Sequence, residues 1–491
     1  MRVPTLAGAI VVAGFALLVA VLVVLSLPWP LIQDAPVMHY IAWRIGEGDV
    51  PYRDLYDINQ PGVYVLHLAL LRSLGAGDGA WRAFDLAWLA LTAGAIALLA
   101  ARWGALAAAG AALAFAAYHL AGGAWQAGQR DYLLCVFLVV GALGVVRWLE
   151  RRSGALSLAG AGLALGAAVG LKPYAVLFAG ALGVVLLVAV IRRGEIVGGG
   201  LRAVAAYVAG AAAVPIALGL WLALAGGLRA WADIVFGYAL PVYGHLGRSA
   251  PWLGHRWLGW IPLGLAAVGA LVAAVVARRA DARHLIAGIG IAYGIVHYVG
   301  QAKGSEYHLY PLATFLCLLA FSALASAWSV GRAWLPVTCA VALAATLILL
   351  ASKGLEASDT PWIWDKERRV RVLVEDLKRG LAPGDTVQVL DIADGGLQAL
   401  LRLHVRQPTR FLYDVLFFHE AERPVVRAMR AEFITALEAR PPRFVVLMRG
   451  WPSGDYDRIR HFPALAELLA RRYDVVVTRE GHRLYAKRAG S

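Results

Sequence analysis

The feature that most limits what this chain can fold into is a series of apolar runs, each close to 20 residues long, within its first 352 residues. A helix of about 20 apolar residues can cross a bilayer. Hydrophobic residues make up 60% of the 491 residues and charged residues 16%, whereas a soluble protein has about 25% charged residues. The sequence therefore predicts a polytopic α-helical membrane protein, and it excludes an ordinary soluble enzyme or a disordered chain.

Eleven of the apolar runs are read as transmembrane helices, with boundaries that could move by about 2–4 residues. They cover residues 6–27, 80–101, 104–120, 132–148, 155–171, 174–191, 203–224, 258–277, 285–300, 308–327 and 334–351. A further run, 63–71, is too short to span, and we expect it to form an interfacial helix. Counting it as a span would move the arginine-rich loops out of the cytoplasm.

Arginine residues mark alternate loops between these runs, as the positive-inside rule predicts for cytoplasmic loops. These loops hold Arg102, Arg147, Arg151, Arg152, Arg192, Arg193, Arg278, Arg279, Arg283 and Arg332. The pattern puts the N-terminus in the cytoplasm and, because the number of spans is odd, the C-terminal region outside it. This topology explains the net charge of +14, so no nucleic-acid partner is expected. The high use of Ala, Gly, Arg and Trp indicates a bacterium, and hence a multi-pass protein of its inner (cytoplasmic) membrane.

Residues 353–491 differ from the membrane region, 1–352, because they hold 43 charged residues against 35 in the longer region. Strand-like segments alternate here with helix-like ones, which predicts a small α/β domain on the periplasmic or extracellular side. The strands are expected at 386–390, 444–447, 473–478 and 483–487, and the helices at 367–381, 396–403, 425–439 and 465–472. The turn at 391–396 matches neither a phosphate-binding loop nor a dinucleotide fingerprint, which favours a plain strand-to-helix turn.

The polar residues of the membrane region gather in its outer loops. The first long outer loop, 28–79, is rich in acidic residues, and the second, 225–257, carries His245 and His255 among aromatic residues and glycines. The spacing of the two histidines gives no metal motif. The second loop could cover a sugar or rest on lipid headgroups, and the sequence leaves both interpretations open.

Asp34 directly follows the first span, at the boundary between lipid and water. Pro36 and the periodic apolar residues after it predict a short amphipathic helix, so Asp34 could be only the N-terminal cap of that helix. Alternatively it is a general base, because partial desolvation at this boundary strengthens a carboxylate as a base. The residues alone favour neither interpretation.

The first loop as a whole resembles that of a known group of enzymes. After Asp34 it contains Gly48-Asp49-Val50-Pro51-Tyr52-Arg53-Asp54 and then Gln60-Pro61, which is similar to the GT-C superfamily of integral-membrane glycosyltransferases. More narrowly it resembles the bacterial branch related to protein O-mannosyltransferases and aminoarabinose transferases. The resemblance covers most of 1–352 and implies a GT-C-like fold with a sugar donor linked to polyprenyl phosphate or diphosphate. It implies that the first loop contacts substrate through His39, Tyr52, Asp54, Asp57 and Gln60.

The resemblance also gives Asp34 the role of catalytic base or metal-associated carboxylate. Many relatives have a second acidic residue directly after it, and here that position is Ala35. A second catalytic carboxylate matches Asp131, which would position the acceptor or a cation near Asp34. Asp131 could instead be a cap that the helix dipole favours. No cofactor is certain, and a divalent metal ion held by Asp34 and Asp131 is the one candidate.

Cationic residues at the outer ends of other spans are candidates for binding the donor phosphate. Lys172 is embedded in an apolar run, where a charge is costly and usually functional, although it could snorkel to the headgroups. Lys303 and His308 share one short outer loop, and we expect them to act with Arg130. Tyr307 could contact substrate or be an aromatic-belt anchor. No role is assigned to two histidines near outer span ends, His119 and His297.

These assignments predict an inverting transferase on the outer face of the membrane. Asp34 would deprotonate an acceptor hydroxyl, which attacks the anomeric carbon while polyprenyl phosphate leaves. The sugar is open, and the acceptor could be a lipid, a glycan or a protein. Two alternatives also stay open: a lipid-linked-oligosaccharide ligase or polymerase with a diphosphate donor, and a non-catalytic transporter of lipid-linked sugars. Acidic residues are nearly absent from the middle of the apolar runs, which argues against proton-coupled transport.

Overall fold

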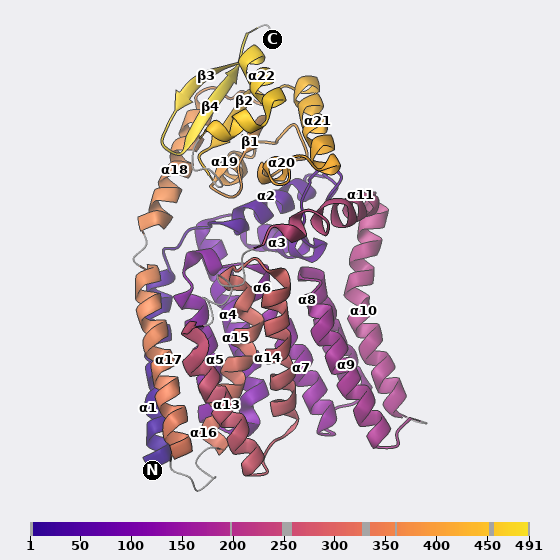
Figure 1. The fold of residues 1–491 in the computed structure, drawn as a ribbon, viewed down its shortest axis with the longest axis vertical. Coiled ribbons are helices and arrows are strands. Elements are labelled where there is room, and N and C mark those ends of the chain that lie inside the picture. Colours follow the sequence, from indigo (N-terminus) through magenta and orange to yellow (C-terminus); the bar gives the residue numbers. More distant parts are fainter. Residues whose placement is uncertain are drawn as a thin grey trace. The chain divides into compact units, whose positions relative to one another are not determined.

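The computed structural model describes residues 3–196, 199–247, 258–326, 334–358, 361–450 and 456–489. Helices account for most of the chain, and a small sheet lies near the C-terminus (Figure 1). The chain divides into two compact units. Unit 1 consists of Met1–Trp29, Gly79–Leu218 and Gly247–Asp359, and unit 2 consists of Pro30–Asp78, Gly219–Leu246 and Thr360–Ser491.

Every one of the eleven predicted spans is helical. The helices are α1 (Val3–Ser26), α4 (Asp78–Ala100), α5 (Ala105–Ala121), α6 (Arg130–Leu133) with α7 (Cys135–Leu149), α8 (Ala155–Leu171), α9 (Ala175–Arg192), α10 (Gly199–Ala225), α13 (Ile261–Val276), α14 (Ala282–Gln301), α15 (Tyr310–Phe321) with the short α16 (Ala323–Ser326), and α17 (Trp334–Ser358). Helix α15 is buried along its whole length, between α5, α13 and α14. It is the central helix of unit 1.

Among the described residues, eight helical stretches are long and apolar enough to cross a membrane. Each matches one of the eleven predicted spans. Of the other three, α5 and α8 have 17 residues each, and α14 has 20 but carries Arg283 and His284 in its first turn. The prediction of a polytopic membrane protein is confirmed by these spans, and the exact number of crossings stays a prediction.

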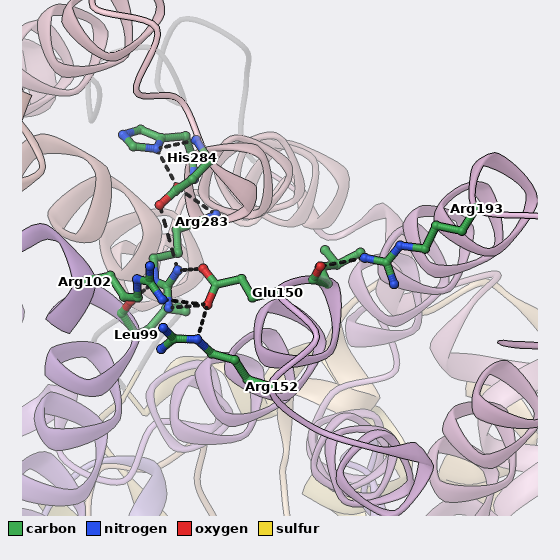
Figure 2. A network of polar contacts seen from close by, with 9 residues as sticks. Leu99, Arg102, Glu150, Arg152, Arg193, Arg283 and His284 are labelled. Atoms are coloured by element: carbon green, nitrogen blue, oxygen red, sulfur yellow. Dashed lines mark hydrogen bonds and ion pairs between the residues drawn. The ribbon is translucent and has the colours of Figure 1, made fainter. Parts of the chain in front are cut away.

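Four of the arginines predicted to face the cytoplasm, Arg102, Arg152, Arg193 and Arg283, bind Glu150 or the neighbouring Leu149 carbonyl (Figure 2), while Arg332 lies outside the described residues. Glu150 pairs with Arg283 and lies 3.8 Å from Arg102 and 3.6 Å from Arg152. Arg193 donates to the carbonyl of Leu149 at 2.6 Å. Four arginine-bearing loops therefore share one end of the helical unit, as an alternate-loop pattern requires. Which side of a membrane this end faces stays a prediction.

Glycines allow α8 and α10 to pack with their backbones almost in contact. A Cβ on Gly162 of α8 would lie 2.1 Å from the carbonyl oxygen of Tyr207, and a Cβ on Gly210 of α10 would lie 2.1 Å from that of Ala159. Small residues are what allow helices to approach so closely in a membrane. This packing fixes α8, whose last residue directly precedes Lys172.

Unit 2 contains the predicted α/β domain. Strands β1 (Val387–Leu390), β2 (Phe444–Met448), β3 (Tyr473–Thr478) and β4 (His482–Lys487) form one sheet in the order β1-β2-β4-β3. Strands β1 and β2 are parallel, and the other pairs are antiparallel. The helices of the domain are α18 (Pro361–Lys378), α19 (Gly396–Leu403), α20 (Val415–Phe418), α21 (Pro424–Ala439) and α22 (Pro463–Arg472). All four predicted strands are confirmed to within one residue at each end.

The first outer loop folds as part of unit 2 and not as a separate segment. It forms α2 (Asp34–Gly46) and α3 (Pro61–Leu74), and the outer segment after α10 adds α11 (Leu228–Ile234). Tyr56 N–H donates to the carbonyl of Arg410 at 2.7 Å, and Gln407 N–H donates to the Tyr40 hydroxyl at 3.0 Å. The helix expected over 63–71 is therefore present, within α3, and its location at a membrane interface stays a prediction.

Candidate functional site

A buried polar cluster forms around Asp131 in unit 1. The carboxylate is fully buried, and its Oδ1 lies 2.5 Å from His297 Nε2 and 3.2 Å from His308 Nδ1. Its other oxygen lies 3.1 Å from the Lys172 ammonium. Burying a carboxylate is costly unless it is paired and hydrogen-bonded, and here one carboxylate is shared by three cationic or potentially cationic groups.

Four separate segments bring these side chains together. Asp131 is the second residue of α6, and Lys172 follows α8 in an extended conformation before Pro173. His297 lies in the last turns of α14, and His308 lies in the 3₁₀ turn η6 (Glu306–Leu309) before α15. Gln301, one turn after His297, accepts from the Lys172 ammonium at 2.6 Å.

Lys303 belongs to the same neighbourhood. It lies in the short connection between α14 and η6, half-buried, and its charge interacts with that of Lys172. Burial and the Lys172 ammonium together lower the pKa of Lys303 to about 8. Two lysines that repel each other in a buried site favour an anion as their partner. Tyr307 packs edge-on against His308, with ring centroids 4.4 Å apart.

The cluster also has the composition of a metal site. The ligand atoms of Asp131, His297 and His308 all lie within 4.8 Å of one another. Two imidazoles and one carboxylate are a set that binds zinc and other divalent transition metals. The residues therefore fit a metal ion, although the Lys172 ammonium already provides a positive charge at the same carboxylate.

Most predicted unit 1 site residues are brought together, and one member of the cluster was missed. Asp131, Lys172, Lys303, Tyr307 and His308 were all predicted, and Arg130, half-buried, precedes Asp131 on α6. Sequence reasoning assigned no role to His297, and the structure puts it on Asp131. The sequence signal for His297 was weak, since it consists only of the four-residue spacing that puts Tyr293, His297 and Gln301 on one helix face. In the structure, the Tyr293 hydroxyl lies 3.2 Å from His297 Nδ1.

A second buried network in unit 1 was not predicted at all. Asp85 Oδ2 lies 2.6 Å from Arg82 Nη1 and 3.0 Å from His119 Nε2. The other imidazole nitrogen of His119 lies 2.7 Å from the Tyr310 hydroxyl, and the Tyr132 ring stacks on the imidazole. His119, which was given no role, therefore joins α4, α5 and α15.

Asp34 lies in unit 2, as the first residue of α2. The N-cap position is occupied by Gln33, with φ of 62° and no side-chain capping hydrogen bond. Asp34 is half-buried. The predicted helix is confirmed, and the simple reading of Asp34 as its N-cap residue is not the geometry observed. Because Asp34 and Asp131 belong to different units, a metal shared by these two carboxylates stays a prediction.

The other first-loop candidates are held by partners within unit 2. His39 and His67 meet through their Nδ1 atoms at 2.7 Å, and the Tyr52 hydroxyl donates to the carbonyl of Asn59 at 2.7 Å. Asp57 accepts from the Tyr64 hydroxyl at 2.6 Å. Two further candidates have local structural roles. The Asp54 carboxylate accepts from Val50 N–H, and Gln60 is the N-cap residue of α3. These contacts stabilise the loop, and substrate contacts of the same residues stay a prediction.

Two other predicted features have simple local roles. His245 lies 3.7 Å from Glu420, while His255 lies outside the described residues. In the turn after β1, the Asp391 carboxylate accepts from five consecutive backbone N–H groups, those of residues 392–396, at 2.6–3.2 Å. Because the turn uses its own carboxylate for these donors, it is a strand-to-helix turn and not an open phosphate cradle.

Comparison with known proteins identifies the fold. No protein-family model matches the sequence, and no curated protein matches it. The structure is similar to that of ArnT from Cupriavidus metallidurans bound to undecaprenyl phosphate, with a TM-score of 0.63, 16% sequence identity, and coverage of 97% of this chain and 98% of that chain. For ArnT in the apo state the TM-score is 0.58, the identity 15%, and the coverage 96% and 97%.

ArnT has the GT-C fold. The likeness covers nearly the whole of both chains, so the GT-C-like fold expected from the first loop is confirmed. At 16% identity the likeness concerns the fold, and function has to be argued from the residues.

Proposed function

We propose that this chain is a membrane glycosyltransferase that moves a sugar from a polyprenyl-phosphate carrier to a hydroxyl acceptor. The observation that carries the proposal is the Asp131 cluster. One buried carboxylate faces Lys172, His297 and His308, with Lys303 close by. A site that brings two lysines together suits a phosphate group, and the fold that contains it is shared with a protein crystallised with undecaprenyl phosphate.

In the proposed reaction, Asp34 removes the proton of the acceptor hydroxyl as the oxygen attacks the anomeric carbon. The bond between that carbon and the phosphate oxygen breaks, and the leaving phosphate takes the electron pair. Lys172 and Lys303, with Arg130 and His308, stabilise the negative charge that develops on the phosphate. Asp131 orients the Lys172 ammonium. A single displacement inverts the anomeric centre.

A divalent metal ion is a further component that the cluster could accept. Asp131, His297 and His308 would hold it, in place of the pair Asp34 and Asp131 expected from the sequence. Such an ion supplies Lewis-acid stabilisation of a phosphate oxygen. Metal analysis of the purified protein and of His297→Gln tests this point, because a bound ion should be lost in the variant.

The sugar, the acceptor and the membrane orientation are parts of the same proposal. The acceptor is a lipid, a glycan or a protein, and the reaction takes place on the outer face of a bacterial inner membrane. The N-terminus is cytoplasmic and the C-terminal domain is periplasmic or extracellular. The carrier lipid and the surrounding membrane lipids are the expected partners, and nucleic acid is not.

The test compares cells that make the wild-type protein, no protein, Asp34→Asn, or Glu47→Gln at equal membrane levels. Glu47 is an exposed carboxylate of the same loop, so its amide variant is the matched control. Polyprenyl-linked sugars and envelope glycans are profiled by mass spectrometry. We expect Asp34→Asn to match the null strain, with one lipid-linked sugar accumulating and one glycan lost, while Glu47→Gln matches the wild type.

The same profiles separate the alternatives. Accumulation of a diphosphate-linked oligosaccharide in the null strain would favour a ligase or polymerase. Wild-type glycans in the Asp34→Asn strain, together with a defect in the null strain, would reject catalysis by Asp34 and favour a transporter.

A further inference from the structure

One lysine of the C-terminal domain is buried against the beginning of the first loop. Lys366 on α18 is only 3% exposed. Its ammonium donates to Gln33 Oε1 at 2.9 Å and to the carbonyl of Ala393. Two basic residues that follow on the same helix, Arg368 and Arg371, are about two-thirds exposed, and Arg369 between them is half-buried. A lysine is rarely buried so completely unless its charge is paired, so this position needs an explanation.

The residue that Lys366 holds is the one before Asp34. Gln33 has φ of 62°, in the left-handed region that is uncommon for residues other than glycine. This turn ends the connection from the first span and sets the direction in which α2 begins with Asp34. A second contact secures the same turn, because Gln398 of α19 donates to the carbonyl of Leu31 at 2.7 Å.

The charges around the ammonium come from both the C-terminal domain and the first loop. Lys366 interacts electrostatically with Asp394, Asp391 and Asp34, which attract its ammonium, and with Arg369, which repels it. The Asp391 carboxylate is already bound by backbone N–H groups of its own turn. Ala393, whose carbonyl accepts from Lys366, has φ of 125°, a strained conformation for alanine that persists only when its surroundings enforce it. Lys366 thus contacts the turn after β1 at its strained residue, Ala393.

We propose that Lys366 is a positioning residue for Asp34: by binding the Gln33 side chain it fixes the turn from which α2 begins with Asp34. The C-terminal domain then has a part in the reaction itself. This inference rests on the proposed function, in which Asp34 is the catalytic base. A displacement of a catalytic group by about 1 Å can cost about 100-fold in rate, so a residue that fixes Asp34 affects turnover more than donor binding.

The test uses the full-length protein with Lys366→Met, Lys366→Arg, Gln33→Ala and the double variant Lys366→Met/Gln33→Ala. Lys378→Met is the matched control, because Lys378 is an exposed lysine of the same helix. Turnover is the rate at which each purified protein consumes the lipid-linked sugar in membranes from the null strain. Binding is measured with undecaprenyl phosphate, for protein in nanodiscs of phosphatidylethanolamine and phosphatidylglycerol.

We expect Lys366→Met to lower turnover by about 10- to 100-fold, with undecaprenyl phosphate affinity within about twofold of wild type. Lys366→Arg, which keeps the charge, should retain more turnover than Lys366→Met. Gln33→Ala should lower turnover less, and the double variant should be no slower than Lys366→Met, because residues that act through one another are not additive. Lys378→Met should match the wild type.

The inference is overturned if Lys366→Met and Gln33→Ala turn over at the wild-type rate, or if their effects multiply in the double variant. It is also overturned if Lys366→Met loses undecaprenyl phosphate binding, because Lys366 would then serve the phosphate. If Lys366→Met fails to accumulate in membranes, Gln33→Ala decides between the same outcomes. A failure of the proposed function is a different result, since it requires Asp34→Asn itself to retain wild-type transfer.

Discussion

Among the described residues of unit 1, two buried networks each centre on an aspartate, and they differ in the cations that surround the carboxylate. Asp85 is matched by Arg82 and His119, and these side chains are no more than 4% exposed. Asp131 faces Lys172 and two histidines, and the Lys172 side chain is 12% exposed, with half-buried Lys303 beyond it. The first network balances its own charge, so packing explains it. The second brings two lysines, Lys172 and Lys303, close to one carboxylate, and neighbouring cations favour a bound anion.

The difference between the Asp85 network and the Asp131 cluster is tested most strongly by removing each central carboxylate. Asp131→Asn should reduce transfer by at least about 100-fold, because the phosphate-facing cations lose the group that orients them. The buried Lys172 charge would also lose its partner, at a cost of about 3–5 kcal/mol in unfolding free energy. Consumption of the lipid-linked sugar and thermal unfolding in detergent measure the two effects. A control double variant, Asp131→Asn/Lys172→Met, should recover stability but not transfer.

Asp85→Asn should have the opposite profile. It leaves Arg82 as an uncompensated buried cation, which destabilises unit 1 by about 3–5 kcal/mol, while the molecules that remain folded should transfer sugar at close to the wild-type rate. Thermal unfolding and the rate per folded molecule check this. A large loss of rate in fully folded Asp85→Asn protein would show that the Asp85 network is also part of the site, so that the two networks would not differ in function.

The position of Lys172 depends on the close packing of α8 against α10. Gly162→Leu would put side-chain atoms where the Tyr207 carbonyl lies, and overpacking of this kind costs about 1–3 kcal/mol. Gly160→Leu on the same helix is the matched control, because an added Cβ there meets nothing within 4 Å. Thermal unfolding of the two variants should differ by several degrees. Equal unfolding temperatures would mean that α8 and α10 separate without penalty.

The rate of transfer should depend on pH through the charge of Lys303, next to the Asp131 cluster. The pKa of Lys303 is lowered to about 8 by burial and by the Lys172 ammonium, so the cation that binds phosphate is lost as pH rises through about 8. Transfer should fall there, and Lys303→Arg should move that limb to higher pH. Stability should change in the opposite sense: between pH 8 and the unfolded value of 10.5 the unfolded chain binds more protons, so folding stability rises with pH. An unshifted limb in Lys303→Arg would assign it to another group.

The smallest effect on stability is expected at Tyr310, at the edge of the Asp85 network. Tyr310→Phe removes the hydroxyl that lies 2.7 Å from His119 Nδ1 and should cost about 1 kcal/mol, with transfer unchanged. Thermal unfolding compared with the wild type measures it. A strong loss of transfer would instead show that the Asp85 network affects the Asp131 cluster, because Tyr310 is only two residues after His308.

The sequence predicted the elements well because each depends on local patterns. The helix expected at 396–403 is α19 with the same bounds, and each expected strand lies within one residue of the observed one. The apolar runs gave the positions of all eleven helices. The exact number of spans stays a prediction, because α14 carries Arg283 and His284 in its first turn and α5 and α8 have only 17 residues each.

The sequence by itself determined the membrane region, the α/β domain, the arginine-bearing loops and most of the residues that could carry chemistry. Only the tertiary structure decided which of them meet. It brought His297 to Asp131 across 166 residues and Lys366 to Gln33 across 333 residues. Periodicity and hydropathy report the environment of each residue along its own helix or strand, and they carry no information on which distant segments pack together. Packing brings those segments into contact, and burial then requires each charge to find a partner.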